Sequence, residues 1–348
     1  PTTIWTSIRS TMRREFLAVL VPRREAQRTL QTVHELGLLD GRRKTVERGG
    51  EVEIPLTGPL PGREVVVQEH PVFYERSPEL ADLLKDDIAP EERVLLPGGW
   101  SILGAVIVVK IDPRIEHLKG RVGEALLEIY PRCSTVLLDR GIAGQLREPD
   151  RVVIAGSEET ETVHREGGVV FKLDPMRTMF SPGNLKERMR MGSLGDGEVI
   201  VDMFAGIGYF TLPMAVHSKP KKITAIELNP IAFGYLVENV RLNHVEGLVR
   251  PVLGDCAVSA PEGVADRVVM GYVGTTDQYL DAGIGALRPG GVLHYHQTVP
   301  EKLYPGMLER DLAVAAERAG RSIKIERCAR VKKYSPGMIH AVVDARVD

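Results

Sequence analysis

Short apolar runs separated by amphipathic segments fill the second half of the chain. Five of these runs have the length of buried strands, and they cover residues 199–203, 222–228, 249–253, 267–273 and 292–297. Helical segments separate them, whereas two final runs, at 322–329 and 339–346, are joined by a short Pro/Gly loop. Strands that alternate with helices form a parallel sheet, and a terminal hairpin adds an antiparallel edge. The pattern therefore predicts an α/β fold with a doubly wound, seven-stranded sheet.

The first 180 residues follow a different pattern. Apolar positions at near-helical spacing predict a helix across 23–38, and a Gly/Pro-rich connection follows at 58–62. The β-rich runs that come next surround one helical stretch, 115–129, and they cover residues 102–111, 136–138, 151–155, 160–164 and 169–173. We therefore expect three parts: a basic N-terminal accessory domain (1–62), a β-rich α+β middle domain (63–180) and the α/β domain (181–348).

Composition limits the partners and the location. The formal net charge is −2, but residues 1–48 hold ten Lys or Arg against five acids. Such a segment either contacts nucleic acid or forms a solvated basic helix. Cys133, Cys256 and Cys328 lie far apart without a C-x-x-C pair, so we expect neither disulfides nor a metal site. The chain lacks both a run of ~18 apolar residues and a signal-peptide pattern, which predicts a soluble, cytoplasmic protein.

Candidate chemistry gathers where the predicted parallel strands end. The first strand runs into Asp202-Met-Phe-Ala-Gly-Ile-Gly208, a turn in which glycines allow a ligand to approach the backbone closely. The second strand ends near Glu227 and the third near Asp255 and Cys256. Parallel strands bring these ends to one edge of the sheet, which is the geometry that holds a nucleoside.

Each of these residues has an assigned role and a simpler alternative. Glu227 is expected to accept hydrogen bonds from the ribose hydroxyls. Asp255 is expected to accept one from the adenine amine, and the backbone N–H of Cys256 is expected to donate one to a ring nitrogen of the adenine. Asp202, Phe204, Ala205 and Gly206 form the first turn of the pocket. The glycines otherwise serve packing, and the two acids otherwise cap helices. Thr211 occupies the third glycine position of the dinucleotide-binding pattern, which argues against a dehydrogenase.

The turn and two further motifs resemble one family. With Asn229-Pro230 and Glu238-Asn-Val-Arg-Leu-Asn243, it is similar to the tRNA guanosine-37 N1-methyltransferase family and its relatives. The segment Phe180–Arg190 resembles the one that precedes their catalytic domain. This resemblance implies a class I S-adenosylmethionine-dependent transferase fold for residues 181–348, with smaller N-terminal accessory domains, and a tRNA partner.

Two segments depart from the methyltransferase pattern. Ser181-Pro182 is followed by Gly183-Asn184, and the fourth strand reads Met270-Gly-Tyr-Val-Gly-Thr-Thr276 where that branch carries Asn-Leu-Pro. These features resemble the archaeal wybutosine-synthesis aminocarboxypropyltransferase family. That family transfers the 3-amino-3-carboxypropyl group of S-adenosylmethionine to carbon 7 of 4-demethylwyosine at tRNA position 37, beside the anticodon, and releases methylthioadenosine.

A sulfonium makes this change of product chemically simple. Its three attached carbons are all electrophilic, so the product depends on which carbon the pocket presents to the nucleophile. Arg188 is expected to pair with the donor carboxylate and Ser181 to add a hydroxyl contact. The basic N-terminal region and the Lys219–Lys222 cluster are expected to hold tRNA phosphates.

Two other functions stay open. One is a tRNA guanosine-37 N1-methyltransferase, and the other is a tRNA-binding protein without activity. His294 and His296 share one strand face, where a structural pair fits as well as a catalytic one. No side chain stands out as a general base, so the sequence assigns no catalytic residue and no oligomeric state.

Overall fold

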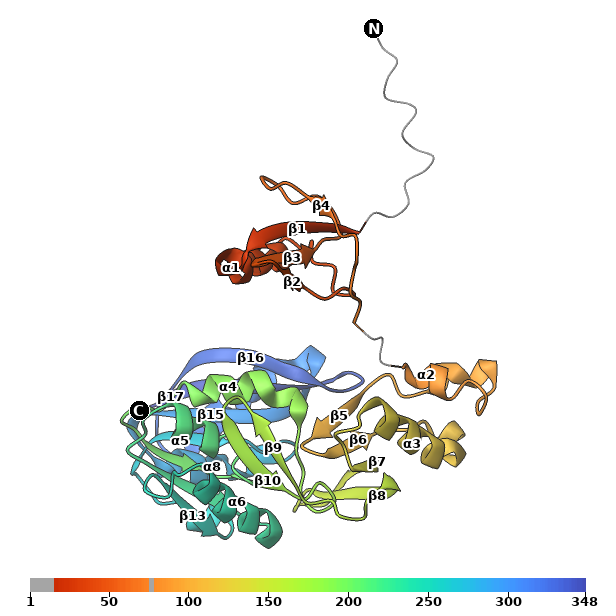
Figure 1. The fold of residues 1–348 in the computed structure, drawn as a ribbon. Helices are drawn as coiled ribbons and strands as arrows, with labels where there is room; N and C mark the ends of the chain where they lie inside the picture. Colours follow the sequence, from red (N-terminus) through yellow and green to blue (C-terminus); the bar gives the residue numbers. More distant parts are fainter. Residues whose placement is uncertain (1–15, 75–77) are drawn as a thin grey trace. The chain divides into compact units, whose positions relative to one another are not determined.

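The computed structural model describes residues 16–74 and 78–348. These belong to two compact units, which follow one another along the chain with the division between Pro78 and Glu79 (Figure 1). The first unit therefore extends past residue 62, where the sequence pattern places its end. Its last strand pairs with its first strand, which explains the later boundary. The division of the rest into a middle and a catalytic domain stays a prediction.

The first unit is a small sheet with one helix. Strand order is β2-β3-β1-β4, and Val19, Val33 and Ile54 are buried between the sheet and α1. Its elements are β1 (Leu17–Pro22), α1 (Arg23–Glu35), β2 (Val46–Arg48), β3 (Glu51–Pro55) and β4 (Val66–Val67). The predicted helix over 23–38 thus ends earlier, because Gly37 adopts a φ of 66° and turns the chain.

The basic residues of this unit do not act alike. Arg43 is buried, and its guanidinium donates to Asp40, to Gln68 and to the backbone oxygens of Leu17 and Leu56. It is a structural residue rather than a phosphate contact. The other Lys and Arg side chains described in this unit are exposed, and they belong to residues 23, 24, 28, 42, 44, 48 and 63. Arg9, Arg13 and Arg14, which belong to the basic region expected to hold tRNA phosphates, lie outside the described residues.

The second unit begins with a four-stranded sheet of order β5-β6-β7-β8, against which α3 packs. The elements up to the next hairpin are α2 (Leu80–Leu83), η1 (Pro90–Leu95), β5 (Trp100–Leu103), β6 (Val106–Val109), η2 (Pro113–Leu118), α3 (Lys119–Ile129), β7 (Thr135–Ala143), β8 (Glu148–Gly156), β9 (Thr162–Glu166) and β10 (Val169–Leu173). The apolar run 102–111 forms two strands instead of one, because Gly104 takes a φ of 57° in the turn between β5 and β6.

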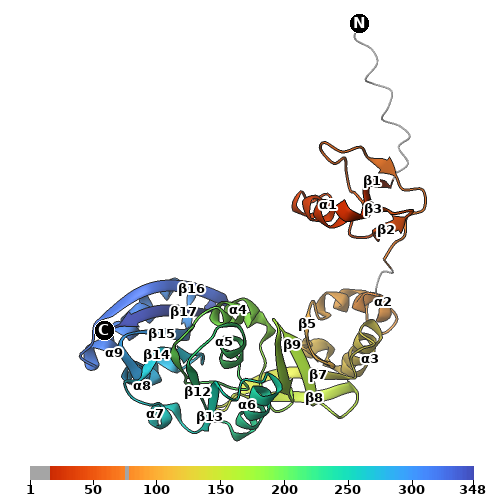
Figure 2. The same ribbon diagram turned by 60° about the vertical axis from the view of Figure 1, so that its left-hand side comes forward.

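A seven-stranded sheet forms the larger part of this unit (Figure 2). Its elements are η3 (Pro182–Asn184), α4 (Leu185–Gly192), β11 (Val199–Asp202), α5 (Thr211–His217), β12 (Lys222–Glu227), α6 (Pro230–Leu242), β13 (Val249–Leu253), α7 (Cys256–Ser259), β14 (Ala265–Met270), η4 (Thr276–Tyr279), α8 (Leu280–Ala286), β15 (Leu287–Pro300), η5 (Glu301–Leu303), α9 (Gly306–Arg318), β16 (Ile323–Ser335) and β17 (Met338–Val347).

The strand order is β13-β12-β11-β14-β15-β17-β16. The first five strands are parallel, and β17 and β16 add an antiparallel edge. Separate apolar clusters contain α5 and α6 on one side and α8 and α9 on the other. This topology confirms the predicted doubly wound sheet. The order reverses between β11 and β14, and ligands bind at such a point beyond the carboxyl ends of the strands.

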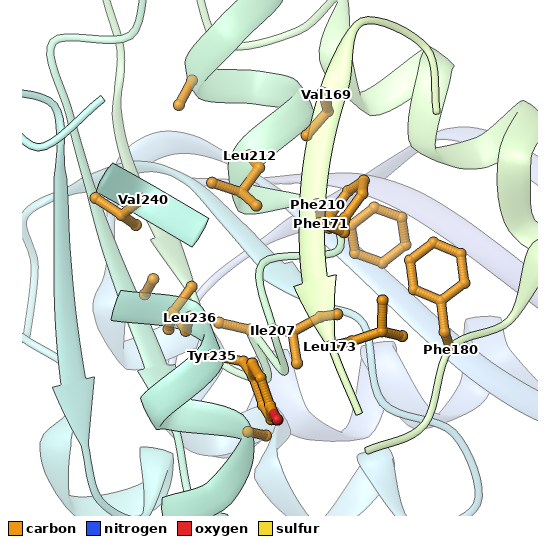
Figure 3. Packing of buried hydrophobic residues seen from close by; sticks show 14 of the residues in the cluster. Val169, Phe171, Leu173, Phe180, Ile207, Phe210, Leu212, Tyr235, Leu236 and Val240 are labelled. Carbon is orange, nitrogen blue, oxygen red and sulfur yellow. The ribbon is translucent and has the colours of Figure 1, made fainter. Parts of the chain in front are cut away.

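The hairpin β9–β10 packs on α5 and α6, although the sequence pattern assigns it to the middle domain. Val169, Phe171 and Leu173 of β10 belong to the same apolar cluster as Leu212 and Leu236 of these helices (Figure 3). Burial of such side chains stabilises the fold by roughly 1.5–3 kcal/mol each. The hairpin is therefore part of the same hydrophobic core as the seven-stranded sheet.

Two asparagines of α6 explain the motif Glu238–Asn243. The Asn239 amide accepts from Lys172 N at 2.6 Å and donates to Lys172 O at 3.0 Å. The Asn243 amide likewise accepts from Val170 N at 2.9 Å and donates to Val170 O at 2.7 Å. Residues four apart on a helix thus match residues two apart on a strand. The motif fastens β10 to α6.

Candidate functional site

A pocket lies at the carboxyl ends of β11, β12, β13 and β14. The space between its walls, part of which is open to solvent, measures about 890 Å³. Five of the residues singled out from the sequence line it, namely Phe204, Gly206, Glu227, Asp255 and Cys256. The topology therefore brings together the strand ends that the sequence pattern predicts to meet.

The first turn of the pocket depends on two glycines. Gly206 has a φ of 57°, and a Cβ there would lie 2.2 Å from the ring of Tyr209. Gly208 has a φ of 105°, and its Cβ would lie 2.6 Å from Leu212. A larger residue would be strained at both positions and would push the turn away from α5. The glycines thus let the backbone line the pocket directly.

Glu227 places its carboxylate at the rim of this turn. Its Oε2 accepts from Gly206 N and its Oε1 from Asn229 N, both at 2.7 Å. Burial raises the pKa of Glu227, and the two backbone N–H donors oppose that rise. Each carboxylate oxygen has a second lone pair for a further donor. A pair of vicinal hydroxyls, such as those of ribose, fits this arrangement.

The third strand supplies a different set of groups. Asp255 caps the short α7 by accepting from Ala257 N at 2.9 Å through Oδ1. Within the described part of the chain, its Oδ2 has no hydrogen-bond partner and remains free to accept an amine. Burial raises the pKa of the Cys256 thiol to about 12, so that thiol is not a nucleophile at neutral pH. The pocket uses this position through its backbone.

Aromatic rings form one wall of the pocket. Phe204 stacks on Tyr272 with ring centroids 5.2 Å apart, and Tyr279 meets Phe204 edge-on at 5.1 Å. All three residues line the same space. Such a wall offers a flat apolar surface to a purine or to a thioether. Tyr279 is one of the residues that the sequence pattern does not single out.

Asp202 and Ala205 lie behind the pocket wall, although the sequence pattern places them among the residues that bind the nucleoside. Asp202 is 1% exposed, and its carboxylate accepts from Phe204 N at 3.2 Å and from the Thr211 hydroxyl at 2.7 Å. Burial raises its pKa to about 6. Ala205 is fully buried and donates its N–H to Ile226 O at 2.9 Å. Both residues shape the turn without lining the pocket.

The expected roles of Ser181 and Arg188 also need correction. Arg188 is 2% exposed, and its guanidinium makes a bidentate pair with Glu166 at 2.6 and 2.8 Å. The remaining nitrogen donates to Ser181 O at 2.8 Å, and the Phe180 ring lies beneath the group. Arg188 thus ties α4 to β9, and it does not line the pocket. Ser181 lies outside the pocket and lines an adjacent cavity.

The turn between β7 and β8 reaches the pocket from the smaller sheet. Gln145 donates to the Tyr279 hydroxyl at 3.1 Å, and Leu146 O accepts from the Asn229 amide at 3.2 Å. The next residue, Arg147, has a φ of 57°, a costly conformation for a side chain of this size. No local sequence signal reveals this contact, because the turn lies more than 80 positions before Asn229.

Arg147 is a half-buried cation that lines the pocket. Its Nη2 lies 3.6 Å from Met179 Sδ, and its guanidinium sits 5.8 Å from the centre of the Tyr272 ring. In the described residues no carboxylate lies within ion-pair distance of it. Arg147 lines both the pocket and the adjacent cavity. Its charge is therefore available to an anionic group where the two spaces join.

The adjacent cavity has a basic and aromatic lining. It shares Met179, Gly271 and Val273 with the pocket, in addition to Arg147. Its further residues include Trp100, Lys110, Asp139, Arg151, Phe180, Tyr334 and Lys332. Asp139 pairs with Arg151 at 3.0 Å and is thereby neutralised. The cavity is suited to an anionic ligand that carries flat rings.

The histidines of β15 form a buried network. His294 bonds Asp344 at 2.6 Å, and His296 bonds His340 at 3.0 Å. Burial lowers the pKa of His296 to about 3, so this histidine is neutral at neutral pH. Among the residues described, no cluster of His, Cys, Asp or Glu is suited to hold a metal ion, and no helix has the length and apolarity to span a membrane.

Comparison with known proteins agrees with this geometry. The model of the TRM5/TYW2 methyltransferase domain matches residues 162–325, the TYW2 N-terminal domain matches 80–160, and the tRNA methyltransferase 5 N-terminal domain matches 18–64. The tRNA(Phe) (4-demethylwyosine(37)-C(7)) aminocarboxypropyltransferase of Pyrococcus horikoshii is 39% identical over 272 residues, which cover 78% of this chain and 96% of that protein. This chain belongs to the TRM5/TYW2 family.

Solved structures of the TRM5/TYW2 family extend the likeness to the fold. P. horikoshii TYW2 in complex with MeSAdo is 36% identical, with a TM-score of 0.68, and the match covers 77% of this chain and 97% of that one. Trm5b from Pyrococcus abyssi is 31% identical, with a TM-score of 0.72, over 96% of this chain and 99% of the other. The seven-stranded sheet and its helices thus have the predicted class I S-adenosylmethionine-dependent transferase fold, and smaller accessory parts precede them in the chain.

Proposed function

We propose that this chain is a tRNA 4-demethylwyosine(37)-C7 aminocarboxypropyltransferase. It transfers the 3-amino-3-carboxypropyl group of S-adenosylmethionine to carbon 7 of the modified guanosine beside the anticodon, and it releases methylthioadenosine. The relative from P. horikoshii that matches 78% of this chain carries this name, and the TYW2 structure from that organism is a complex with MeSAdo. Donor and product both contain the nucleoside that the pocket fits.

The donor nucleoside occupies the strand ends in this proposal. Glu227 accepts hydrogen bonds from both ribose hydroxyls, and the free Oδ2 of Asp255 accepts one from the adenine amine. The Cys256 N–H meets an adenine nitrogen, and Phe204 packs against the ring. The backbone at Gly206 allows the sulfonium end to pass close to the first turn. This arrangement fixes the nucleoside and leaves the choice of transferred carbon to other residues.

The observation that carries the choice of product is the end of β14. There Gly271, Tyr272 and Val273 line the pocket with a glycine, an aromatic ring and an aliphatic side chain. A methyl transfer to guanosine N1 requires a group that takes the N1 proton, and this part of the lining offers neither a carboxylate nor an amide. Carbon 7 attacks without first losing a proton, so an apolar wall suits that reaction.

Arg147 holds the donor carboxylate in this proposal, in place of Arg188. Its guanidinium has no carboxylate partner among the residues described, and it lies where the pocket joins the basic cavity. A pair between this guanidinium and the carboxylate draws the aminocarboxypropyl arm toward the cavity. The γ-carbon of that arm then faces the acceptor, and the methyl group points elsewhere. In-line placement of the reacting carbons accounts for the selectivity.

The acceptor is the anticodon loop of a tRNA, with its modified base in the second cavity. Trp100 and Phe180 offer rings to the base, and Lys110 offers a charge to the backbone. The first unit adds exposed basic side chains, among them Arg24 and Arg28 on α1. Binding is therefore expected to weaken as the salt concentration rises.

One assay separates this function from its alternatives. The protein is incubated with tRNA that carries 4-demethylwyosine, first with donor labelled in the carboxyl carbon and then with donor labelled in the methyl group. Carboxyl label in the tRNA and methyl label in methylthioadenosine are the expected results. Methyl label in the tRNA would indicate a methyltransferase instead. Tight tRNA binding without transfer of either label would indicate a binding protein.

A further inference from the structure

Lys332 is a half-buried lysine on β16 that faces the second cavity. Its Nζ donates to the Ser181 hydroxyl at 2.6 Å. In the described residues no acid lies within ion-pair distance of this amine, although most buried lysines have such a partner. Its aliphatic chain passes close to Gly183, where an added Cβ would meet Lys332 Cδ at 3.4 Å. The amine is thus held in place by the Ser181–Gly183 segment.

The groups around Lys332 are mostly cationic or neutral. Arg188 approaches from α4, Arg147 from the β7–β8 turn, and His340 stands opposite on β17. Lys110, Lys333, Tyr334, Arg151 and Asp139 line the same cavity. Burial and the positive charges of Arg188 and Arg147 lower the pKa of Lys332. Deprotonation of the Lys332 amine therefore costs less free energy here than it would on the protein surface.

We propose that Lys332 receives the proton that leaves carbon 7 of the acceptor base, an inference that rests on the proposed function. Carbon 7 attacks the γ-carbon of the donor, the bond between that carbon and sulfur breaks, and its electron pair stays on sulfur. Methylthioadenosine leaves neutral, and the acceptor ring system takes up the positive charge. The lone pair of Nζ then removes the carbon 7 proton, and the C–H electron pair restores the aromatic ring. The ammonium afterwards releases the proton to solvent.

Other groups in the cavity are less suited to this step. His340 is bonded to His296, and burial lowers its pKa so strongly that it is a weak base. Asp139 is paired with Arg151 and lies 3.8 Å from Lys110. A neutral amine also avoids repelling the cationic sulfonium and the cationic ring that follows it. Lys332 is the base that meets both requirements.

The test uses the variants Lys332→Met and Lys332→Arg in the full chain, with Lys324→Met as the matched control. Lys324 lies on the same strand and is exposed at a distance from the cavity. Single-turnover transfer of carboxyl label is measured at saturating donor and tRNA across pH 6 to 10. The wild-type rate is expected to rise with pH as Lys332 loses its proton and then to level off. Lys332→Met is expected to be slower by about 10²-fold or more at the plateau and to lose this dependence.

Lys332→Arg distinguishes a proton acceptor from a positive charge. Arginine preserves the charge but stays protonated over this range, so it is expected to be as slow as Lys332→Met. A rate for Lys332→Arg within threefold of wild type would overturn the proposal and make Lys332 an anion contact. An unchanged pH profile in Lys332→Met would also overturn it. Donor affinity measured by calorimetry checks that each variant is folded.

The controls also separate this inference from the proposed function. If the wild-type protein transfers no carboxyl label, the proposed function fails and the inference fails with it. If wild type and Lys324→Met transfer the label equally while Lys332→Met keeps the wild-type rate, the function stands and only the role of Lys332 is refuted.

Discussion

Removal of the Glu227 carboxylate is expected to weaken donor binding strongly. In the variant Glu227→Ala, both ribose hydroxyls of the donor lose a charged acceptor. A hydrogen bond to a charged group contributes roughly 1.5–3 kcal/mol, so the loss of two costs at least about 3 kcal/mol. That free energy corresponds to a rise in Kd of roughly 150-fold. The affinity for tRNA should stay unchanged, because Glu227 lines the pocket and not the second cavity.

The same change also affects the fold, and the two effects must be measured separately. Gly206 N and Asn229 N both donate to Glu227 at 2.7 Å and lose their acceptor in the variant. An unsatisfied buried donor costs about 1–3 kcal/mol, less where water enters the space left by the side chain. We therefore expect a lower free energy of unfolding together with the loss of affinity. Glu227→Gln keeps the volume and one acceptor oxygen, so its affinity should lie between wild type and Glu227→Ala.

Calorimetric titration with S-adenosylmethionine, and separately with methylthioadenosine, measures the effect. Both ligands should lose affinity to the same degree, because both contain the ribose. Glu246→Ala, which removes an exposed acid beyond the end of α6, is the matched control and should bind like wild type. An unchanged Kd in a folded Glu227→Ala protein would refute the placement of the ribose.

Four further predictions follow from other groups. Burial raises the pKa of Asp202 from 3.8 to about 6, so the free energy of unfolding should fall as the pH rises from about 4 to 6. Asp202→Asn should abolish this fall, which amounts to up to about 3 kcal/mol and is measured by chemical denaturation at several pH values. Burial lowers the pKa of His296 from 6.5 to about 3, so as the pH drops this histidine is protonated in the unfolded state before it is protonated in the folded state. The free energy of unfolding should therefore fall below about pH 6.5, and His296→Gln should flatten that fall in the same measurement. Arg147→Met should weaken binding of S-adenosylmethionine by roughly tenfold and leave binding of methylthioadenosine unchanged, because only the former has a carboxylate. A protein that begins at Glu79 should bind tRNA more weakly and with a shallower salt dependence than the full chain, and equal binding across a salt titration would remove the first unit from the tRNA site.

The seven-stranded sheet and the pocket edge could be predicted from the sequence because both depend on local patterns. Apolar runs of strand length mark buried parallel strands, and the acids that follow them are placed by the topology alone. Gly206, Glu227 and Asp255 therefore line the pocket as the pattern predicts. The cap that Asn229 forms on α6 follows from the same kind of local signal, because its Oδ1 accepts from Ile231 N at 2.9 Å.

Charged side chains could not be assigned in this way. Arg188 looked suited to a ligand carboxylate, but Glu166 of the β9–β10 hairpin already binds its Nε and Nη2. Arg147 follows an ordinary turn sequence, and only the tertiary packing brings it to the donor pocket. Which acid pairs with which base depends on distances between elements that no periodicity encodes.

The asparagines of α6 have a consequence for the outer edge of the β9–β10 hairpin. A two-stranded sheet leaves one side of each strand with unpaired N–H and C=O groups, which can recruit a strand from another molecule. At Val170 and Lys172 these groups are already occupied by the amides of Asn243 and Asn239. The helix thus takes the place of a neighbouring strand with two side chains. At these two positions the backbone of β10 therefore has no free groups with which a strand of another molecule could pair.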